Sequence, residues 1–82
     1  MSTTFRLTLA QLNPTVGDFA GNAAKARAAR ERAKSAGSDL LVLPESFLTG
    51  YQTQDLVMRP GFWAEAMATC DALAPATKDG PA

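Results

Sequence analysis

Histidine is missing from this 82-residue sequence, and Cys70 is its only cysteine. Without histidine, the common zinc sites and Ser-His-Asp catalysis lack their central residue, and one cysteine cannot form an intrachain disulfide. Eight basic residues balance eight acidic ones, so the formal net charge is zero. Such a chain generates no long-range field that draws nucleic acid or an anionic membrane toward it. We therefore expect neither of these partners.

Long apolar runs are also missing. No stretch approaches the ~20 apolar residues that a membrane-spanning helix needs. The N-terminal sequence MSTTFRLTLAQLN has too short an apolar stretch for a signal peptide. We therefore expect a cytoplasmic protein. What the sequence does have is 46% hydrophobic residues, which is typical of a soluble globular domain.

The pattern of apolar residues predicts the order strand, helix, strand, helix. Residues 5–12 alternate apolar and polar side chains as a strand does. Asp18 can cap a helix that runs to about Ala36, and Gly37 follows as a natural stop. The apolar run at residues 39–43 is typical of a parallel strand covered on both faces. A strand-helix-strand unit of this length indicates an α/β fold with a parallel sheet.

A second helix is predicted over residues 62–74, after a loop at residues 52–61. Its apolar positions include Cys70, so we expect this thiol to pack as a small buried hydrophobe and not to act as a nucleophile. Residues 75–82 are expected to form a surface turn. Two strands leave both edges of their sheet open, which indicates an unfinished sheet whose third strand should begin after this turn.

Glu45 is the candidate for chemistry because it directly follows the second predicted strand. Ligands of open α/β sheets collect at the carboxyl ends of the strands. Pro44 ends the strand and aims the next side chain in a defined direction. A half-buried carboxylate beside Leu43 and Phe47 would have a raised pKa and would suit a general base. The residues alone leave a solvated loop acid or a capping group as an equal alternative.

Tyr51 is a second candidate, placed directly after Gly50. Its phenol could bind a substrate, or its ring could simply pack after the turn, because tyrosine suits both settings. The lysines at positions 25, 34 and 78 fall on a helix surface or in the tail. Lysine in such positions is usually solvated, so none of them is expected to be catalytic.

Three motifs, in order along the chain, carry a family resemblance: AQLNPTVGDFAGN from Ala10, DLLVLPESFLTGY from Asp39 and DLVMRPGF from Asp55. Together they resemble the start of a nitrilase-superfamily carbon–nitrogen hydrolase, most closely the glutaminase domains of glutamine-dependent NAD synthetases. The resemblance implies that residues 1–82 are the N-terminal fragment of such a domain. That fragment would be the βαβα portion of an αββα sandwich, incomplete on its own, with the rest of the domain and any synthetase domain absent.

The resemblance also implies a role for Glu45. In this family a Cys, a Glu and a Lys cooperate at strand ends, and Glu45 matches the glutamate that acts as general base. The Lys and the nucleophilic Cys would lie beyond residue 82, so the isolated chain is expected to be inactive. The complete domain would attack the amide of glutamine or another small amide, form a thioester and release ammonia for NAD synthesis.

Cofactors and partners are implied in the same way. No cofactor and no metal is expected in this segment, because ATP and Mg²⁺ would belong to the absent synthetase domain. The expected partners are the small amide substrate and the rest of the same polypeptide, and the complete protein is expected to be a homo-oligomer. No nucleic acid and no membrane is expected.

Of three alternatives, the second is disfavoured and the other two stay open. The chain could belong to a stand-alone amidase of the same superfamily, which a fused ATP-binding domain would exclude. The stretch SAGSDLLVLP is similar to the phosphoryl-acceptor strand of signalling receiver domains, but residues 10–13 lack the acidic pair that would hold Mg²⁺ there. A non-catalytic α/β interaction module would fit the open strand edges.

Overall fold

The computed structural model describes residues 4–82, apart from the side chain of Asp55. The described elements follow the predicted order of strand, helix, strand and helix, with a 3₁₀ turn on either side of the second helix. In chain order they are β1 (Leu7–Leu9), α1 (Phe19–Ser35), β2 (Leu40–Val42), η1 (Gln54–Met58), α2 (Pro60–Leu73) and η2 (Ala74–Thr77). The predicted α/β fold is confirmed.

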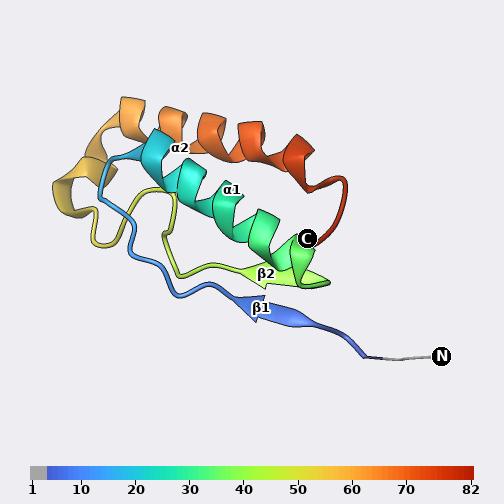
Figure 1. Cartoon of the computed structure of the whole chain (residues 1–82). Coiled ribbons are helices and arrows are strands. Elements are labelled where there is room, and N and C mark those ends of the chain that lie inside the picture. The colour runs from blue at the N-terminus through green and yellow to red at the C-terminus, as the bar shows by residue number, and fades with distance from the viewer. Residues whose placement is uncertain (1–3) are drawn as a thin grey trace.

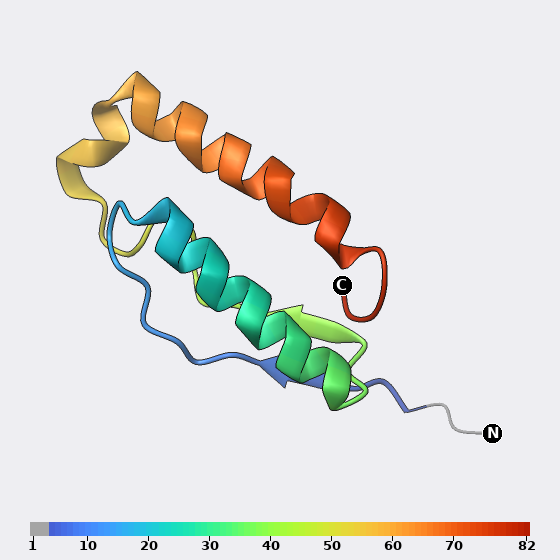
Figure 2. The same cartoon turned by 45° about the horizontal axis from the view of Figure 1, so that its top comes forward.

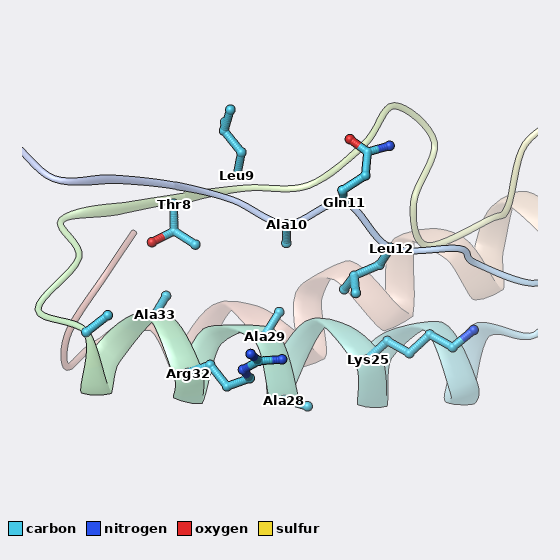
Figure 3. Close-up of a pocket in the computed structure, with 11 residues that line it drawn as sticks. Thr8, Leu9, Ala10, Gln11, Leu12, Lys25, Ala28, Ala29, Arg32 and Ala33 are labelled. Atoms are coloured by element: carbon cyan, nitrogen blue, oxygen red, sulfur yellow. The ribbon is translucent and has the colours of Figure 1, made fainter.

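The elements stack in three layers, with α1 on one face of the sheet and α2 on the far side of α1 (Figures 1 and 2). The strands β1 and β2 are parallel, with Leu7 opposite Leu40 and Leu9 opposite Val42. Side chains of paired residues point to the same face of a sheet, so these four residues share one face. Thr8 points to the other face, toward α1 (Figure 3).

The sheet face opposite α1 is apolar and exposed. Leu7 is 53% exposed, Leu9 72% and Val42 41%. The sequence predicted a second strand covered on both faces, and for the described residues this is wrong because both helices stack on the same side. An apolar sheet face of this kind is typical of a sheet that packs against a second sheet.

Helix α1 begins and ends where the sequence predicted. The Asp18 carboxylate accepts a hydrogen bond from the backbone N–H of Gly21 at 2.9 Å. Gly37, with φ of +74°, follows the last turn, and this left-handed conformation costs glycine little. The buried face carries three alanines, one phenylalanine and two polar residues: Phe19, Asn22, Ala23, Ala26, Arg30 and Ala33.

Helix α2 packs on α1 through a row of residues that does not include Cys70, which the sequence predicted to be buried. The rings of Phe62 and Phe19 lie 5.1 Å apart between centroids, with planes tilted by 57°, a favourable arrangement for aromatic pairs. The half-buried positions that continue from Phe62 follow helical spacing: Ala66, Thr69 and Leu73. Cys70 lies one position beyond this row and is exposed. The prediction of a buried thiol is therefore wrong, because α2 contacts its neighbour along a narrow strip only.

Two element boundaries also differ from the prediction. The predicted strand at residues 5–12 is reduced to Leu7–Leu9, since among the described residues β1 pairs with β2 alone. The predicted loop at residues 52–61 contains η1 and the start of α2. Pro60 is the first residue of α2, a position where its missing N–H has no intrahelical partner to lose.

The chain returns to the sheet at Ala82. Its backbone N–H donates to the carbonyl oxygen of Asp39 at 3.1 Å, and its own carbonyl oxygen accepts from the N–H of Leu41 at 2.8 Å. Bonds to residues on either side of Leu40 are the pattern of a parallel strand. The backbone of Ala82 therefore lies beside β2, on its free side, and the third strand itself stays a prediction.

Two cations of α1 hold this returning segment. The Nε of Arg30 donates to the carbonyl oxygen of Pro81 at 3.2 Å, and another of its N–H groups donates to the carbonyl oxygen of Asp79. The Nζ of Lys34 lies 2.6 Å from the Asp79 carboxylate. This hydrogen bond raises the pKa of Lys34 above its ordinary value and lowers that of Asp79. Both side chains are largely exposed, so water and salt weaken the pair.

The ion pair predicts a pH-dependent attachment of the tail. The contribution of Asp79 is present above about pH 4 and is lost as the pH falls through its lowered pKa, because the protonated acid no longer pairs. The contribution of Lys34 is present below about pH 10 and is lost as the pH rises through its raised pKa. At neutral pH and low salt, Asp79→Asn should therefore accelerate hydrogen exchange of the Leu41 amide, which Ala82 protects.

The measurement is the ratio of variant to unsubstituted exchange rates in the full protein at several pH values. The ratio should exceed one at neutral pH and should approach one only as the pH falls through the lowered pKa of Asp79. Asp71→Asn, on the exposed side of α2, is the matched control because this carboxylate takes no part in the attachment. A ratio of one at neutral pH and low salt would contradict the prediction.

Candidate functional site

Glu45 lies just beyond the carboxyl end of β2, as the sequence predicted. Leu43 and Pro44 carry the chain out of the strand, and Glu45 opens a tight turn that runs to Thr49. The turn sends Phe47 into the core, where it is 5% exposed, and leaves Glu45 exposed. The predicted half-burial of Glu45 is therefore wrong for the described chain. Its role as general base stays a prediction.

The turn after Glu45 is held by its own hydrogen bonds. Both the backbone N–H of Gly50 and the Oγ1 of Thr49 donate to the carbonyl oxygen of Ser46, at 2.8 and 3.1 Å. Ser46 has a φ of +56°, a left-handed conformation that non-glycine residues adopt only where the surroundings enforce it. The backbone that carries Glu45 is thus compact and constrained.

A second loop, residues 13–17, packs directly on this turn. The backbone N–H of Gly17 donates to the carbonyl oxygen of Thr49 at 2.9 Å. Gly50 has a φ of +83°, and a Cβ at this position would lie 2.4 Å from the Cα of Val16. Glycine is therefore required at position 50 both by its backbone conformation and by the close approach of the other loop.

Asn22 joins the two loops from the first turns of α1. Its side chain is completely buried, with 0% exposure. Its Oδ1 accepts from the N–H of Thr15 at 2.9 Å, and its Nδ2 donates to the carbonyl oxygens of Thr15 at 2.8 Å and Leu48 at 3.0 Å. Both donors of the amide and its oxygen are thereby satisfied.

Sequence reasoning missed Asn22, although a signal was present. Asparagine is unfavourable inside helices, because its side chain competes for backbone groups, and is preferred at caps and turns. Asn22 nevertheless lies three residues after Phe19, on the same helical face as the buried alanines of α1. An amide in that position requires polar partners, and the two loops supply them. The contact joins the segments NPTVGD and PESFLTGY, which lie far apart in the sequence.

Tyr51 lies beside the turn and is 65% exposed. It lines an open pocket of about 400 Å³ together with Ser46 and residues 52–54. The pocket brings Tyr51 next to the residue that follows Glu45. A substrate-binding role for Tyr51 stays a prediction.

A second hollow, with a volume of about 510 Å³, runs between residues 8–12 and helix α1 (Figure 3). Lys25 reaches along its edge, and its Nζ donates to the carbonyl oxygen of Asn13 at 2.7 Å. None of the eleven residues that line it carries a carboxylate or a thiol. The groove therefore has neither a general base of the expected kind nor a thiol nucleophile.

Within residues 4–82, leaving aside the side chain of Asp55, no cluster of three His, Cys, Asp or Glu side chains could hold a metal ion. Neither α1 nor α2 has the length and apolar character that crossing a membrane requires.

Comparison with known proteins decides the family. Residues 6–80 match the carbon–nitrogen hydrolase family. The chain belongs to this family. The predicted resemblance to the nitrilase superfamily is thereby confirmed, and all three motifs that carried it lie within the matched residues.

The relatives of this carbon–nitrogen hydrolase chain are glutamine-dependent NAD(+) synthetases. The synthetase of Rhodobacter capsulatus is 61% identical over 82 residues, which cover 100% of this chain and 15% of that protein. The synthetase of Thermotoga maritima is 58% identical over 60 residues, or 73% of this chain and 10% of that protein. The chain therefore spans 15%, or about one seventh, of the length of the Rhodobacter capsulatus synthetase.

A solved structure agrees with these sequence matches. The crystal structure of a glutamine-dependent NAD(+) synthetase from Cytophaga hutchinsonii is similar, with a TM-score of 0.83 and 33% sequence identity. The match covers 88% of this chain and 12% of that one. The described α/β arrangement is thus a portion of the fold of that enzyme.

The close contact at Gly50 predicts a large effect of a single methyl group. In the full protein, Gly50→Ala should force the 13–17 loop and the 45–49 turn apart, because the added Cβ would overlap the Val16 backbone. We expect a lower melting temperature in thermal unfolding of the full protein. Gly61→Ala is the matched control, since a Cβ there would meet nothing within 4 Å and alanine favours a helix. Equal behaviour of the two variants would contradict the described contact.

Proposed function

We propose that this chain is the N-terminal part of a glutamine amide hydrolase that supplies ammonia for ATP-dependent NAD synthesis, with Glu45 as its general base. The observation that carries the proposal is the placement of Glu45 at the carboxyl end of β2 in a chain of the carbon–nitrogen hydrolase family. The synthetases named above, which are similar to the chain over most of its length, support glutamine as the amide.

The proposed chemistry follows from the protons that a thiol nucleophile must exchange. A cysteine beyond residue 82 would attack the amide carbon, and Glu45 would take the proton from its thiol. The leaving ammonia needs a proton, which the protonated Glu45 would return. Glu45 would then deprotonate the water that hydrolyses the thioester, while a lysine, also beyond residue 82, would stabilise the tetrahedral oxyanion. An exposed carboxylate at a strand end is free to meet both groups.

Cys70 does not fit the role of this nucleophile. It lies on α2, which α1 separates from the sheet, and near the end of α2 that is remote from the turn after Glu45 (Figure 1). A thiol nucleophile must lie within hydrogen-bond distance of its base, or must come within that distance when the substrate binds. The proposed nucleophile is therefore a different cysteine of the complete protein.

The remaining parts of the proposal concern the complete protein. Residues 1–82 would be the N-terminal fragment of its hydrolase domain, and the rest of the polypeptide would complete that domain and supply an ATP- and Mg²⁺-dependent synthetase domain. We propose a cytoplasmic homo-oligomer. The apolar sheet face at Leu7, Leu9 and Val42 suits the contact between sheets in an αββα sandwich.

Glu45→Gln in the full protein tests the proposed general base. Glutamine keeps the size of the side chain but cannot transfer a proton, so the fold and melting temperature should hardly change. Glutamine-driven NAD formation should fall by at least ~10²-fold, the usual scale for a lost acid–base group. NAD formation driven by external ammonia should persist, because it bypasses the amide hydrolysis.

The measurement is a pair of steady-state rates, one with each nitrogen source. Glu65→Gln, on the exposed side of α2, is the matched control and should leave both rates unchanged. Equal loss with glutamine and ammonia would assign Glu45 a structural role. No loss with either source would show that Glu45 is not the base.

Cys70→Ala tests whether the exposed thiol takes part in turnover. Because Cys70 is exposed, its replacement should change the free energy of unfolding by no more than about 0.5 kcal/mol, the usual range for surface substitutions. Glutamine-driven turnover should be unchanged. Thermal unfolding and a rate measurement on the same variant check both statements, and a hundredfold loss of rate in a normally folded protein would refute them.

A further inference from the structure

We propose that Asn22 is a positioning residue for Glu45, acting through the backbone of the turn that Glu45 opens. This inference rests on the proposed function, since it assigns the turn a task in amide hydrolysis. Asn22 is 0% exposed and therefore does not touch a substrate in the described chain. Its effect on the reaction must pass through the groups that it holds.

The contacts of Asn22 connect two segments that the chain separates widely. Its amide donates to the carbonyl oxygen of Leu48, 26 residues away, and binds both backbone groups of Thr15, seven residues away. Leu48 is the third residue after Glu45. One buried side chain thus fixes the 45–49 turn relative to the 13–17 loop and to the first turns of α1.

The turn is held at both ends, and Asn22 donates one of the hydrogen bonds that hold its downstream end. On the upstream side, Glu45 is tied to the sheet through β2. On the downstream side, the turn is held by the bond from Asn22 to Leu48 and by the bond from the N–H of Gly17 to Thr49 at 2.9 Å. Without the amide, three partly buried backbone groups lose their partner, and groups of this kind must rearrange to find a new partner.

A rearrangement of this size matters for proton transfer. A general base works within about 2.6–3.2 Å of the proton that it takes. Misplacement by about 1 Å, even from a substitution remote from the chemistry, can cost on the order of 10²-fold in rate. The kcat of amide hydrolysis should therefore respond to Asn22, whereas substrate binding elsewhere should respond little.

Ser38 provides a matched control at the other end of α1. It is also buried, with 8% exposure, and its hydroxyl also joins separate segments. Its Oγ accepts from the Oγ1 of Thr8 at 2.8 Å and lies within hydrogen-bond distance of the carbonyl oxygens of Arg6, at 3.2 Å, and Leu40, at 3.0 Å. Ser38 is at the amino ends of the strands, away from Glu45, so its loss perturbs folding but not the turn.

The experiment uses the full protein and compares Asn22→Ala, Asn22→Asp and Ser38→Ala. Asn22→Asp keeps the volume and the acceptor for Thr15 but loses both N–H donors. Both Asn22 variants should lower the glutamine-driven kcat by about 10- to 100-fold with KM nearly unchanged, and both should leave the ammonia-driven rate intact. Ser38→Ala should lower the melting temperature and leave the ratio of the two rates unchanged.

A double variant separates positioning from general destabilisation. If Asn22 acts through Glu45, then adding Asn22→Ala to Glu45→Gln should cause no further loss of glutamine-driven kcat, because the group being positioned is already disabled. Losses that multiply would overturn the inference, as would equal loss with both nitrogen sources or the same selective loss in Ser38→Ala. Failure of both Asn22 variants to fold, while Ser38→Ala folds, would assign Asn22 to folding alone and also overturn it.

The same measurements distinguish this inference from the proposed function. If Glu45→Gln loses the glutamine-driven rate and the Asn22 variants do not, the positioning role is wrong and the general base stands. If Glu45→Gln retains the rate, the proposed function itself is wrong.

Discussion

The buried amide of Asn22 is the contact on which the functional end of the molecule depends. Its three hydrogen bonds satisfy backbone groups of the 13–17 loop and the 45–49 turn at once, and they come from a side chain that is itself fully buried. Gly50 then allows the two backbones to approach without a side chain between them. Because buried polar groups are costly when unpaired, neither loop can leave this arrangement without disturbing the other.

The layer order follows from the small side chains of α1. Its alanines let the helix lie close to the sheet, while the contact of Phe19 with Phe62 sets α2 on the outer side. Arg30 and Lys34 hold the returning chain beside β2. Both helices lie on the same side of the sheet. The opposite face, with Leu7, Leu9 and Val42, stays available for contact with another sheet.

Within three residues, the turn after β2 places one side chain in the core and another at the surface. Phe47 enters the core and fixes the turn, whereas Glu45 stays exposed at the strand end. A carboxylate placed in this way has a rigid backbone and a free side chain. Its final environment depends on the groups that the complete protein places around it.

The sequence by itself determined the order of elements, the cap at Asp18, the stop at Gly37 and the place of Glu45, because each depends on local backbone chemistry or on periodicity. Only the tertiary structure decided which side chains are buried. Cys70 is exposed because the rotation of α2 is set by Phe62, a contact between distant residues. Asn22 gained its role, and Ala82 its place beside β2, from partners more than 20 residues away, and periodicity carries no information about such pairings.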